Sequence, residues 1–308
     1  NNKTHQAYKC KARVVAKEFM EVPGRDYFDV YSAEVNVKAF RLCLDILCLS
    51  PDHCAEQWDI TAGFLHAIME EKIFMVRVAE QAERFEDMYN FLKDVVSNKD
   101  SDFTTEERNL LSVGFKNLIG SNRTAIRTIG AIEQNPKYQK YSASLLAYRQ
   151  KIEAELFTQC LSIVSLVKDK CISLASNSES KAFFLKMAGD YYRYVAESAQ
   201  GDKLTEVKNG ALDYYNQASE IANKDLNACN PIRLGLALNF SVFHYEVMSD
   251  HKKACQLGEV ALQSALDKID ECDEEMFRDA KSIIELLKEN LSLWKEDEGE
   301  GGNEIEDL

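Results

Sequence analysis

Residues 77–295 are predicted to form an all-α domain, a bundle of about nine antiparallel helices. The chain of 308 residues contains only 4 prolines and 13 glycines, so it has few of the residues that interrupt helices. Helix-start signals recur along this region, and apolar residues follow a helical period between them. The spacing leaves room for several long helices joined by short loops, which favours antiparallel neighbours.

The order of the helices follows from their start and stop signals. Thr104 and Glu107 form a capping box, in which the hydroxyl and the carboxylate each accept a free backbone N–H. Ser176 and Glu179 repeat this spacing before another helix. Further starts are predicted at Asn230-Pro231, Asp250 and Asp273, and Gly201 is predicted to end one helix before the next begins near Leu204.

The chain changes character near residue 76. Residues 1–76 carry a net charge of −2 and mix short β-rich runs with loop signals, which is typical of an α+β fragment. A strand is predicted at 11–16 and a turn at 22–26. At the other end, residues 296–308 are rich in acidic residues and glycine and poor in apolar side chains, which predicts a disordered acidic tail.

Composition excludes several classes of protein. The net charge of −14 argues against a nucleic-acid binder, and no apolar run approaches the roughly 18 residues of a membrane span. Residues 1–10 contain no secretory signal, so we expect a cytoplasmic protein, with the nucleus as a further compartment. Nine cysteines without a C-x-x-C motif favour reduced thiols. A zinc site from Cys43, Cys48, Cys54 and His53 is a weaker alternative.

Two helices place cations on one face. Lys116, Arg123 and Arg127 fall on one stripe, and Lys186 and Arg193 flank Asp190 on another helix. Taken singly, each stripe is more typical of a solvated helix face, because surface charge is common. Taken as a pocket on an acidic protein, two arginines and a lysine suit a dianionic phosphate, because the planar guanidinium matches two phosphate oxygens.

The predicted helix at Pro231 has two apolar stripes. One contains Leu234, Leu238, Val242 and Tyr245, and the other contains Leu236, Phe240, Phe243 and Val247. One stripe can face a core, whereas the second indicates either burial on both sides or the apolar wall of a groove. Asn239 and Glu246 lie at the border, where the amide of Asn239 could bind an extended peptide backbone.

From about Val78 to Trp294 the chain resembles the 14-3-3 family. Five segments carry the resemblance in order: Ala79-Glu-Gln-Ala-Glu-Arg84, residues 107–120, Phe184-Leu-Lys-Met-Ala-Gly-Asp-Tyr-Tyr-Arg-Tyr194, residues 231–243 and Leu286-Leu-Lys-Glu-Asn-Leu-Ser-Leu-Trp294. The resemblance implies a nine-helix protomer in a cup-shaped dimer that binds phosphoserine or phosphothreonine peptides in an amphipathic groove. It implies no cofactor and no bound metal.

The resemblance also assigns residues to roles. The implied phosphate ligands are Lys116, Arg123, Arg193 and Tyr194. The implied peptide groove comprises Lys186, Leu238, Asn239, Val242, Glu246, Ile283, Leu286, Asn290, Leu293 and Trp294. The implied dimer interface comprises Val78, Ala82, Arg84, Asp87, Tyr148, Lys151 and Glu155. Across that interface Arg84 is expected to pair with Glu155 and Asp87 with Lys151, in a homodimer or in a heterodimer with paralogues.

Two positions depart from the family pattern. Ala188 stands where a basic groove residue is frequent, and Ala125-Ile126 stands where many members have a phosphorylatable serine followed by tryptophan. Because Ala125 has no hydroxyl, the usual route to phosphorylation-induced monomers is closed.

The first 76 residues resemble the start of a copia-type retrotransposon reverse transcriptase. Segments such as Asp26-Tyr-Phe-Asp-Val-Tyr-Ser32 and Gln57-Trp-Asp-Ile-Thr-Ala-Gly-Phe-Leu65 carry the resemblance. Asp59 falls on the first metal-binding aspartate, but the Tyr-x-Asp-Asp motif that two-metal chemistry needs is absent. We therefore expect no enzyme. A phosphopeptide-dependent adaptor is the leading hypothesis, and a phosphorylation-independent helical scaffold or a remnant polymerase segment are the alternatives.

Overall fold

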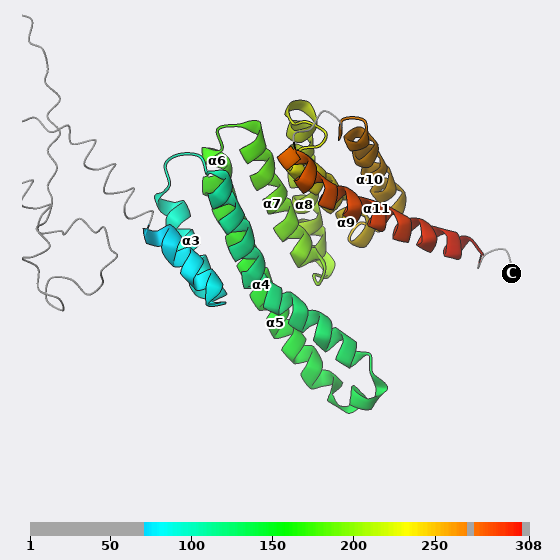
Figure 1. The fold of residues 1–308 in the computed structure, drawn as a ribbon. Helices are drawn as coiled ribbons and strands as arrows, with labels where there is room; N and C mark the ends of the chain where they lie inside the picture. The colour runs from blue at the N-terminus through cyan, green and yellow to red at the C-terminus, as the bar shows by residue number, and fades with distance from the viewer. Residues whose placement is uncertain (1–70, 270–273, 304–308) are drawn as a thin grey trace, which may run out of the picture. The chain divides into compact units, whose positions relative to one another are not determined.

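The computed structural model describes residues 71–269 and 274–303, and all its regular elements there are helical (Figure 1). A helical run covers residues 71–81. The helices that follow are α3 (Phe85–Asn98), α4 (Thr105–Glu133), α5 (Ser142–Leu166), α6 (Ile172–Leu174), α7 (Ser178–Ala196), α8 (Gly201–Asp225), α9 (Pro231–Glu246), α10 (His251–Leu266) and α11 (Glu274–Asn303). A 3₁₀ segment, Pro136–Tyr141, precedes α5, and a π-helical segment, Val167–Cys171, joins α5 to α6.

The predicted all-α fold is confirmed in the described part of the chain. Residues 142–174 form one helical run through α5, the π-helical segment and α6. With residues 71–81 this makes nine helical runs among the described residues, as the sequence predicts. None of the helices described is long and apolar enough to cross a membrane.

Capping contacts fix where several helices begin. At α4, Thr104 Oγ1 accepts the N–H of Glu107 at 3.2 Å and Glu107 Oε2 accepts the N–H of Thr104 at 2.8 Å, so the predicted capping box is confirmed. Asn230 caps α9, and Asp250 caps α10 by accepting the N–H of Lys253. These caps satisfy backbone donors that no earlier carbonyl can reach.

Two predicted boundaries were wrong. Asn177, not Ser176, caps α7 by accepting the N–H of Ser180 at 2.8 Å. The hydroxyl of Ser176 donates instead to Asp102. Gly201 does not separate two helices but begins α8, with a backbone φ of +61°. Glycine tolerates this left-handed conformation without the clash that a Cβ atom would cause. The predicted start at Asp273 and the predicted elements at 11–16 and 22–26 lie outside the described residues.

Helical structure extends beyond residues 77–295 at both ends of the described region. Val76 is completely buried and belongs to the main core together with Ala79, so the boundary expected after residue 76 falls inside the run 71–81. At the other end α11 continues to Asn303, past the expected start of the tail at residue 296. The helical hydrogen-bond pattern extends through local contacts even where few apolar side chains remain to be buried.

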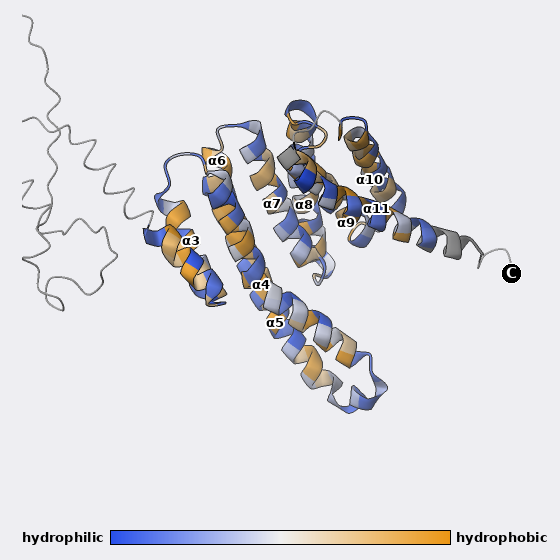
Figure 2. Ribbon diagram, viewed as in Figure 1, coloured by the Kyte–Doolittle hydropathy of each residue, from blue (hydrophilic) through white to orange (hydrophobic). Residues whose placement is uncertain are grey.

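Neighbouring helices pack as pairs along the chain. The long helices α4 and α5 lie side by side, as do α7 with α8 and α9 with α10 (Figure 1). Hydrophobic positions recur along each helix between hydrophilic ones (Figure 2). The fully buried side chains include Phe115, Phe184, Tyr215 and Phe243, and burying such rings supplies most of the stabilising free energy of a core.

The contact between α7 and α8 depends on a glycine. A Cβ atom at Gly189 would lie 3.0 Å from the ring of Tyr215. The absence of that atom lets α7 approach α8 closely and brings the Tyr215 hydroxyl to the polar face of α7. This approach positions the site described below.

Candidate functional site

Three aromatic and cationic side chains meet between α4 and α7. Arg123 lies on α4, whereas Arg193 and Tyr194 lie on α7, 70 positions further along the chain. The guanidinium of Arg123 lies 4.1 Å from the centre of the Tyr194 ring, and that of Arg193 lies 4.6 Å from it. Two positive charges therefore lie against one aromatic ring. They repel each other, and an anion bound between them would offset this repulsion.

A carboxylate already offsets part of this repulsion. Glu197 accepts from Arg123 at 2.7 Å and 2.9 Å through Nη2 and at 3.2 Å through Nε. Arg127 and Arg193 each approach the same carboxylate at 3.4 Å. Three guanidinium groups thus surround one glutamate. Sequence reasoning did not single out Glu197, although its position four residues after Arg193 on one helix face was a usable signal.

Arg123, Arg127, Tyr194 and Glu197 line a pocket with a volume of about 290 Å³, and the buried Arg193 lies beside it without lining it. Its wall is completed by Ile126, Leu156, Ser198, Glu246 and Val247. Lys116, the fourth expected phosphate ligand, lies two turns before Arg123 on α4 with its side chain exposed, and it does not line this pocket. Its ammonium makes no ion pair with the residues that the structure describes, so it is available to an anion. The pocket therefore has two cations, Arg123 and Arg127, and two acidic residues, Glu197 and Glu246. Glu246 lies 3.9 Å from Arg193.

A second polar group lies on the same face of α7. Asp190 is buried and accepts from Lys186 at 2.7 Å, from Tyr215 at 2.6 Å and from Asn239 at 2.8 Å. Burial alone raises the pKa of Asp190, but the charges of Lys186 and Arg193 outweigh it and lower the pKa below its usual range. Asp190 therefore remains ionised and fixes the side chains around it.

The orientation of Asn239 follows from this bond. Its Nδ2 group donates to Asp190, so the amide oxygen is left to accept a hydrogen bond from another group. An extended peptide offers backbone N–H donors of the required kind.

Helix α11 exposes apolar residues on one side. Leu286 is 48% exposed and Leu293 is 58% exposed, and Ile283 and Asn290 fall on the same helical face. The adjacent face of the helix, which includes Leu287 and Leu291, is buried. An amphipathic helix in a monomeric domain rarely exposes such a row of leucines, which is typical of a binding surface.

Helix α9 carries other residues expected in the groove, and its two apolar stripes differ in burial. Phe240 and Phe243 are buried in the main core, whereas Leu238 and Val242 are only partly buried. Leu234, on the same stripe as Leu238, is buried against α10 and α11. Trp294, an expected groove residue, is only 6% exposed, and its ring stacks on Tyr245 with the ring centres 4.8 Å apart. Trp294 is therefore packed inside the protein and offers little surface to a ligand.

The expected dimer residues lie on exposed surfaces. Val78 is 41% exposed and Tyr148 is 56% exposed, and Ala82 is exposed as well. Within the single chain, Arg84 bonds Asp87, and Lys151 lies 3.9 Å from Glu155. Both pairs lie on the surface, where exchanging one partner for another costs little free energy.

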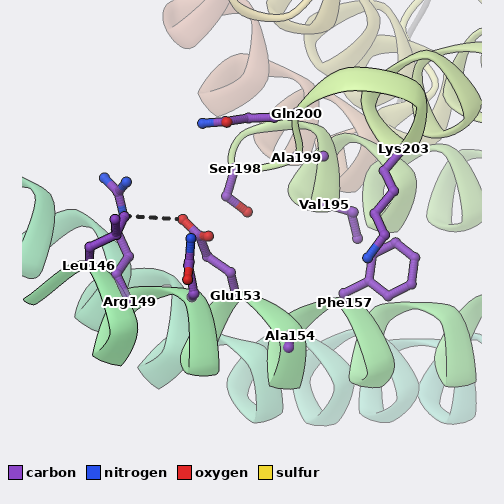
Figure 3. Close-up of a pocket in the computed structure, with 11 residues that line it drawn as sticks. Leu146, Arg149, Glu153, Ala154, Phe157, Val195, Ser198, Ala199, Gln200 and Lys203 are labelled. Carbon is purple, nitrogen blue, oxygen red and sulfur yellow. Dashed lines mark ion pairs between the residues drawn. The ribbon is translucent and has the colours of Figure 1, made fainter. Parts of the chain in front are cut away.

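Another pocket lies between α5 and the link from α7 to α8 (Figure 3). Two cations, Arg149 and Lys203, line it. Arg149 is paired with Glu133 at 2.7 Å and with Glu153 at 3.4 Å, the second contact being dashed in Figure 3. Burial raises the pKa of the Glu153 carboxyl. The two carboxylates balance the charges of Arg149 and Lys203, so this pocket lacks the excess positive charge that a phosphate requires.

Comparisons with known proteins separate the two parts of the chain. The family model "Reverse transcriptase (RNA-dependent DNA polymerase)" matches residues 1–100, and the family model "14-3-3 protein" matches residues 75–295. The overlap, 75–100, contains Met88 and Leu92, which are buried in the helical body. Asp59 and the cysteines considered for zinc lie outside the described residues. Among the residues that the structure describes, no cluster of His, Cys, Asp and Glu could hold a metal ion.

Several curated proteins resemble most of the chain. A 14-3-3-like protein, RA215, from Solanum tuberosum is 43% identical over 77% of this chain and 95% of its own length. The 14-3-3 protein 3 of Entamoeba histolytica is 44% identical over 74% of this chain and 96% of its own length. The 14-3-3-like protein GF14-F of Oryza sativa subsp. japonica is 44% identical over 78% of this chain and 95% of its own length. On these matches and on its helical fold, the chain belongs to the 14-3-3 protein family.

Proposed function

We propose that this protein is an adaptor that binds client proteins through peptides phosphorylated on serine or threonine. The family consists of adaptor proteins without catalytic activity, and the reverse transcriptase match is confined to the N-terminal part. The observation that carries the proposal is the convergence of Arg123, Arg127 and Arg193 on one carboxylate beside Tyr194. A phosphate dianion carries more charge than that carboxylate. Its oxygens can accept bidentate hydrogen bonds from Arg123 and from Arg193.

The surroundings of the arginines suit a peptide rather than a free anion. The oxygen of Asn239 is left to accept a backbone N–H, and Leu286 and Leu293 offer apolar surface to side chains that flank the phosphate. Phosphate contacts alone would bind any phosphorylated molecule. The amide and the leucines add a requirement for an extended chain, which is how an adaptor selects clients.

We propose in addition that the protein acts as a dimer, since homodimerisation is typical of the family. The exposed apolar side chains of Val78 and Tyr148 support this proposal. A dimer carries two grooves, so two phosphorylated sites on one client can bind together with a gain in avidity.

Calorimetry with a phosphorylated peptide and its unphosphorylated copy tests the proposed function. We expect the phosphorylated peptide to bind at least about 100-fold more tightly, since it gains several charge-assisted hydrogen bonds. The difference should shrink at high salt because the partly exposed charges are screened. Equal affinity for the two peptides would favour the phosphorylation-independent scaffold instead.

A further inference from the structure

The hydroxyl of Tyr215 joins the phosphate pocket to the residues that face the peptide backbone. On one side it accepts a hydrogen bond from Arg193 Nε at 3.4 Å. On the other it donates to Asp190 Oδ1 at 2.6 Å. Burial raises the pKa of Tyr215 well above its usual value, so the hydroxyl keeps its proton and this direction of donation.

Asp190 links Tyr215 to Asn239 on helix α9. The same Oδ1 atom that accepts from Tyr215 also accepts from Asn239 Nδ2 at 2.8 Å, and Oδ2 accepts from Lys186. The chain Arg193–Tyr215–Asp190–Asn239 therefore crosses α7, α8 and α9 with a hydrogen bond at every step. Its two ends are the residues proposed to hold the phosphate and the peptide backbone.

The core holds the tyrosine ring rigidly. Its ring stacks on Phe240 with the ring centres 5.2 Å apart and packs against Phe243 at 5.6 Å. The backbone of α7 closes the other side at Gly189. A fully buried ring with neighbours on these sides cannot rotate away, so the position of its hydroxyl is determined by packing and not by the groove.

We propose that Tyr215 is a positioning residue that couples phosphate recognition by Arg193 to backbone recognition by Asn239. This inference rests on the proposed phosphopeptide function. Arg193 is itself buried, and a long guanidinium without this acceptor gains rotational freedom. Tyr215 removes that freedom before the ligand arrives, so less entropy is lost when the phosphate binds.

The variant Tyr215→Phe tests the role, because it keeps the ring and deletes only the hydroxyl. We expect about a 3- to 10-fold loss of affinity for the phosphorylated peptide, the usual effect of one hydrogen bond, with the thermal midpoint of unfolding little changed. Tyr214→Phe is the matched control: it removes a hydroxyl from the next residue, where the ring stacks on Tyr192 and the hydroxyl has no hydrogen-bond partner among the described residues. Its affinity should equal that of the unaltered protein.

A double-mutant cycle distinguishes positioning from a general loss of packing. Arg193→Lys and Asn239→Ala should have non-additive effects on affinity in the protein with Tyr215 and additive effects in Tyr215→Phe. If Tyr215→Phe loses helicity, Asp190→Asn breaks the same chain at its next link, and the same loss of coupling is expected.

The outcomes separate the inference from the proposed function. Equal affinity for phosphorylated and plain peptides in the unaltered protein would overturn the function itself. Strong preference for the phosphorylated peptide, together with unchanged affinity and coupling in Tyr215→Phe, would overturn only the positioning role. Loss of affinity in Tyr214→Phe equal to that in Tyr215→Phe would overturn it as well, since the effect would not be specific to the bonded hydroxyl.

Discussion

The side chains at the arginine cluster differ in their contacts and in their exposure to solvent. Arg123 makes the shortest contacts with Glu197 and also faces the Tyr194 ring, whereas Arg127 is largely exposed. Lys116 lies apart and is exposed. We infer that Arg123 provides a bidentate contact to the phosphate, and that Lys116 and Arg127 add mainly long-range attraction.

Arg123→Ala should weaken binding of the phosphorylated peptide by about 10- to 100-fold, because it removes a charge-assisted contact worth about 1.5–3 kcal/mol. Its effect on folding should be small, since the side chain is partly exposed and its ion pair with Glu197 is screened. Calorimetry and urea unfolding measure the two effects. Arg278→Ala, which removes an exposed arginine from α11, is the control, and an equal loss of affinity in that variant would contradict a specific contact.

Glu197→Gln should strengthen binding of the phosphorylated peptide by about 3- to 10-fold at low salt, or about 1 kcal/mol. The amide oxygen still accepts from Arg123, so the arginine stays in place, while the repulsion between carboxylate and phosphate is removed. Titrations at two salt concentrations measure the gain. Glu206→Gln removes an exposed carboxylate from α8 and should leave the affinity unchanged. Weaker binding in Glu197→Gln would show that the charge of Glu197 is needed to place the arginines.

His244 predicts a pH dependence of stability. Both of its ring nitrogens are buried without a hydrogen-bond partner among the described residues, and Phe240 and Phe243 pack against the ring. Burial lowers the pKa of His244; Asp250 raises it and Lys253 lowers it, both by smaller amounts. Below the unfolded pKa of about 6.5 the unfolded chain therefore binds a proton that the folded protein resists, so stability falls as the pH falls through that value.

His244→Phe should remove this contribution, since phenylalanine fits among the neighbouring rings and does not titrate. Urea unfolding at pH 7.5 and pH 5.5 should show a smaller loss of stability on acidification in the variant than in the unaltered protein. His251→Phe, at an exposed position in α10, is the control. An identical loss of stability in the His244 variant and the unaltered protein would contradict the assignment.

At the scale of elements, α9 and α11 each serve two surfaces. One face of each helix is buried in a core, and the other carries partly or fully exposed apolar residues. Trp294 and Leu291 of α11 pack with Ala254 of α10 behind the face that carries the proposed groove. The groove wall is therefore backed by packed side chains, and a substitution on its open face should affect binding more than folding.

Val242→Asp should reduce affinity for the phosphorylated peptide by at least about 10-fold, because it places an unpaired carboxylate against the peptide. We expect helicity to persist, since Val242 is only partly buried. Val260→Asp makes the same change at an exposed position of α10 and should bind normally. If circular dichroism shows that Val242→Asp unfolds, Val242 belongs to the core and not to the groove wall.

At the scale of the whole molecule, the run 71–81 and helix α5 carry the surfaces proposed for dimerisation. Tyr148 is exposed in the single chain and so contributes little to its folding. Arg84 and Asp87 pair within the chain, and Lys151 and Glu155 do the same. We infer that apolar contacts supply most of the affinity between protomers and that charges select the partner.

Tyr148→Asp should weaken the dimer by at least about 10-fold, because it removes a large aromatic contact and adds a charge at the interface. Light scattering of the full chain over a range of micromolar concentrations measures the change. Tyr141→Asp alters a similarly exposed tyrosine beside α5 and should leave the dimer intact. A protein that is monomeric before any substitution would refute the proposed interface.

Local features of the molecule could be predicted from the sequence because local contacts produce them. The capping box at Thr104 joins residues that are three positions apart. The apolar stripes of α9 arise because residues three or four positions apart lie on the same face of a helix. The start of α7 was misplaced by one residue, because Ser176 and Asn177 are both good caps and only the distant Asp102 decides between them. The site residues were proposed from a family resemblance and from helical spacing. Helical spacing specifies the face of a helix on which a residue lies, but not which other helix packs against that face.

The sequence by itself determined the all-α fold, most helix starts and the face on which each charge lies, since these depend on residues within a turn or two of one another. Only the tertiary structure decided that Arg123 and Arg193 share Glu197, that Tyr215 bonds both Arg193 and Asp190, and that Trp294 is buried. These contacts join helices tens of residues apart. Their geometry depends on how closely α7 and α8 pack, and that distance follows from side-chain volumes across the whole core.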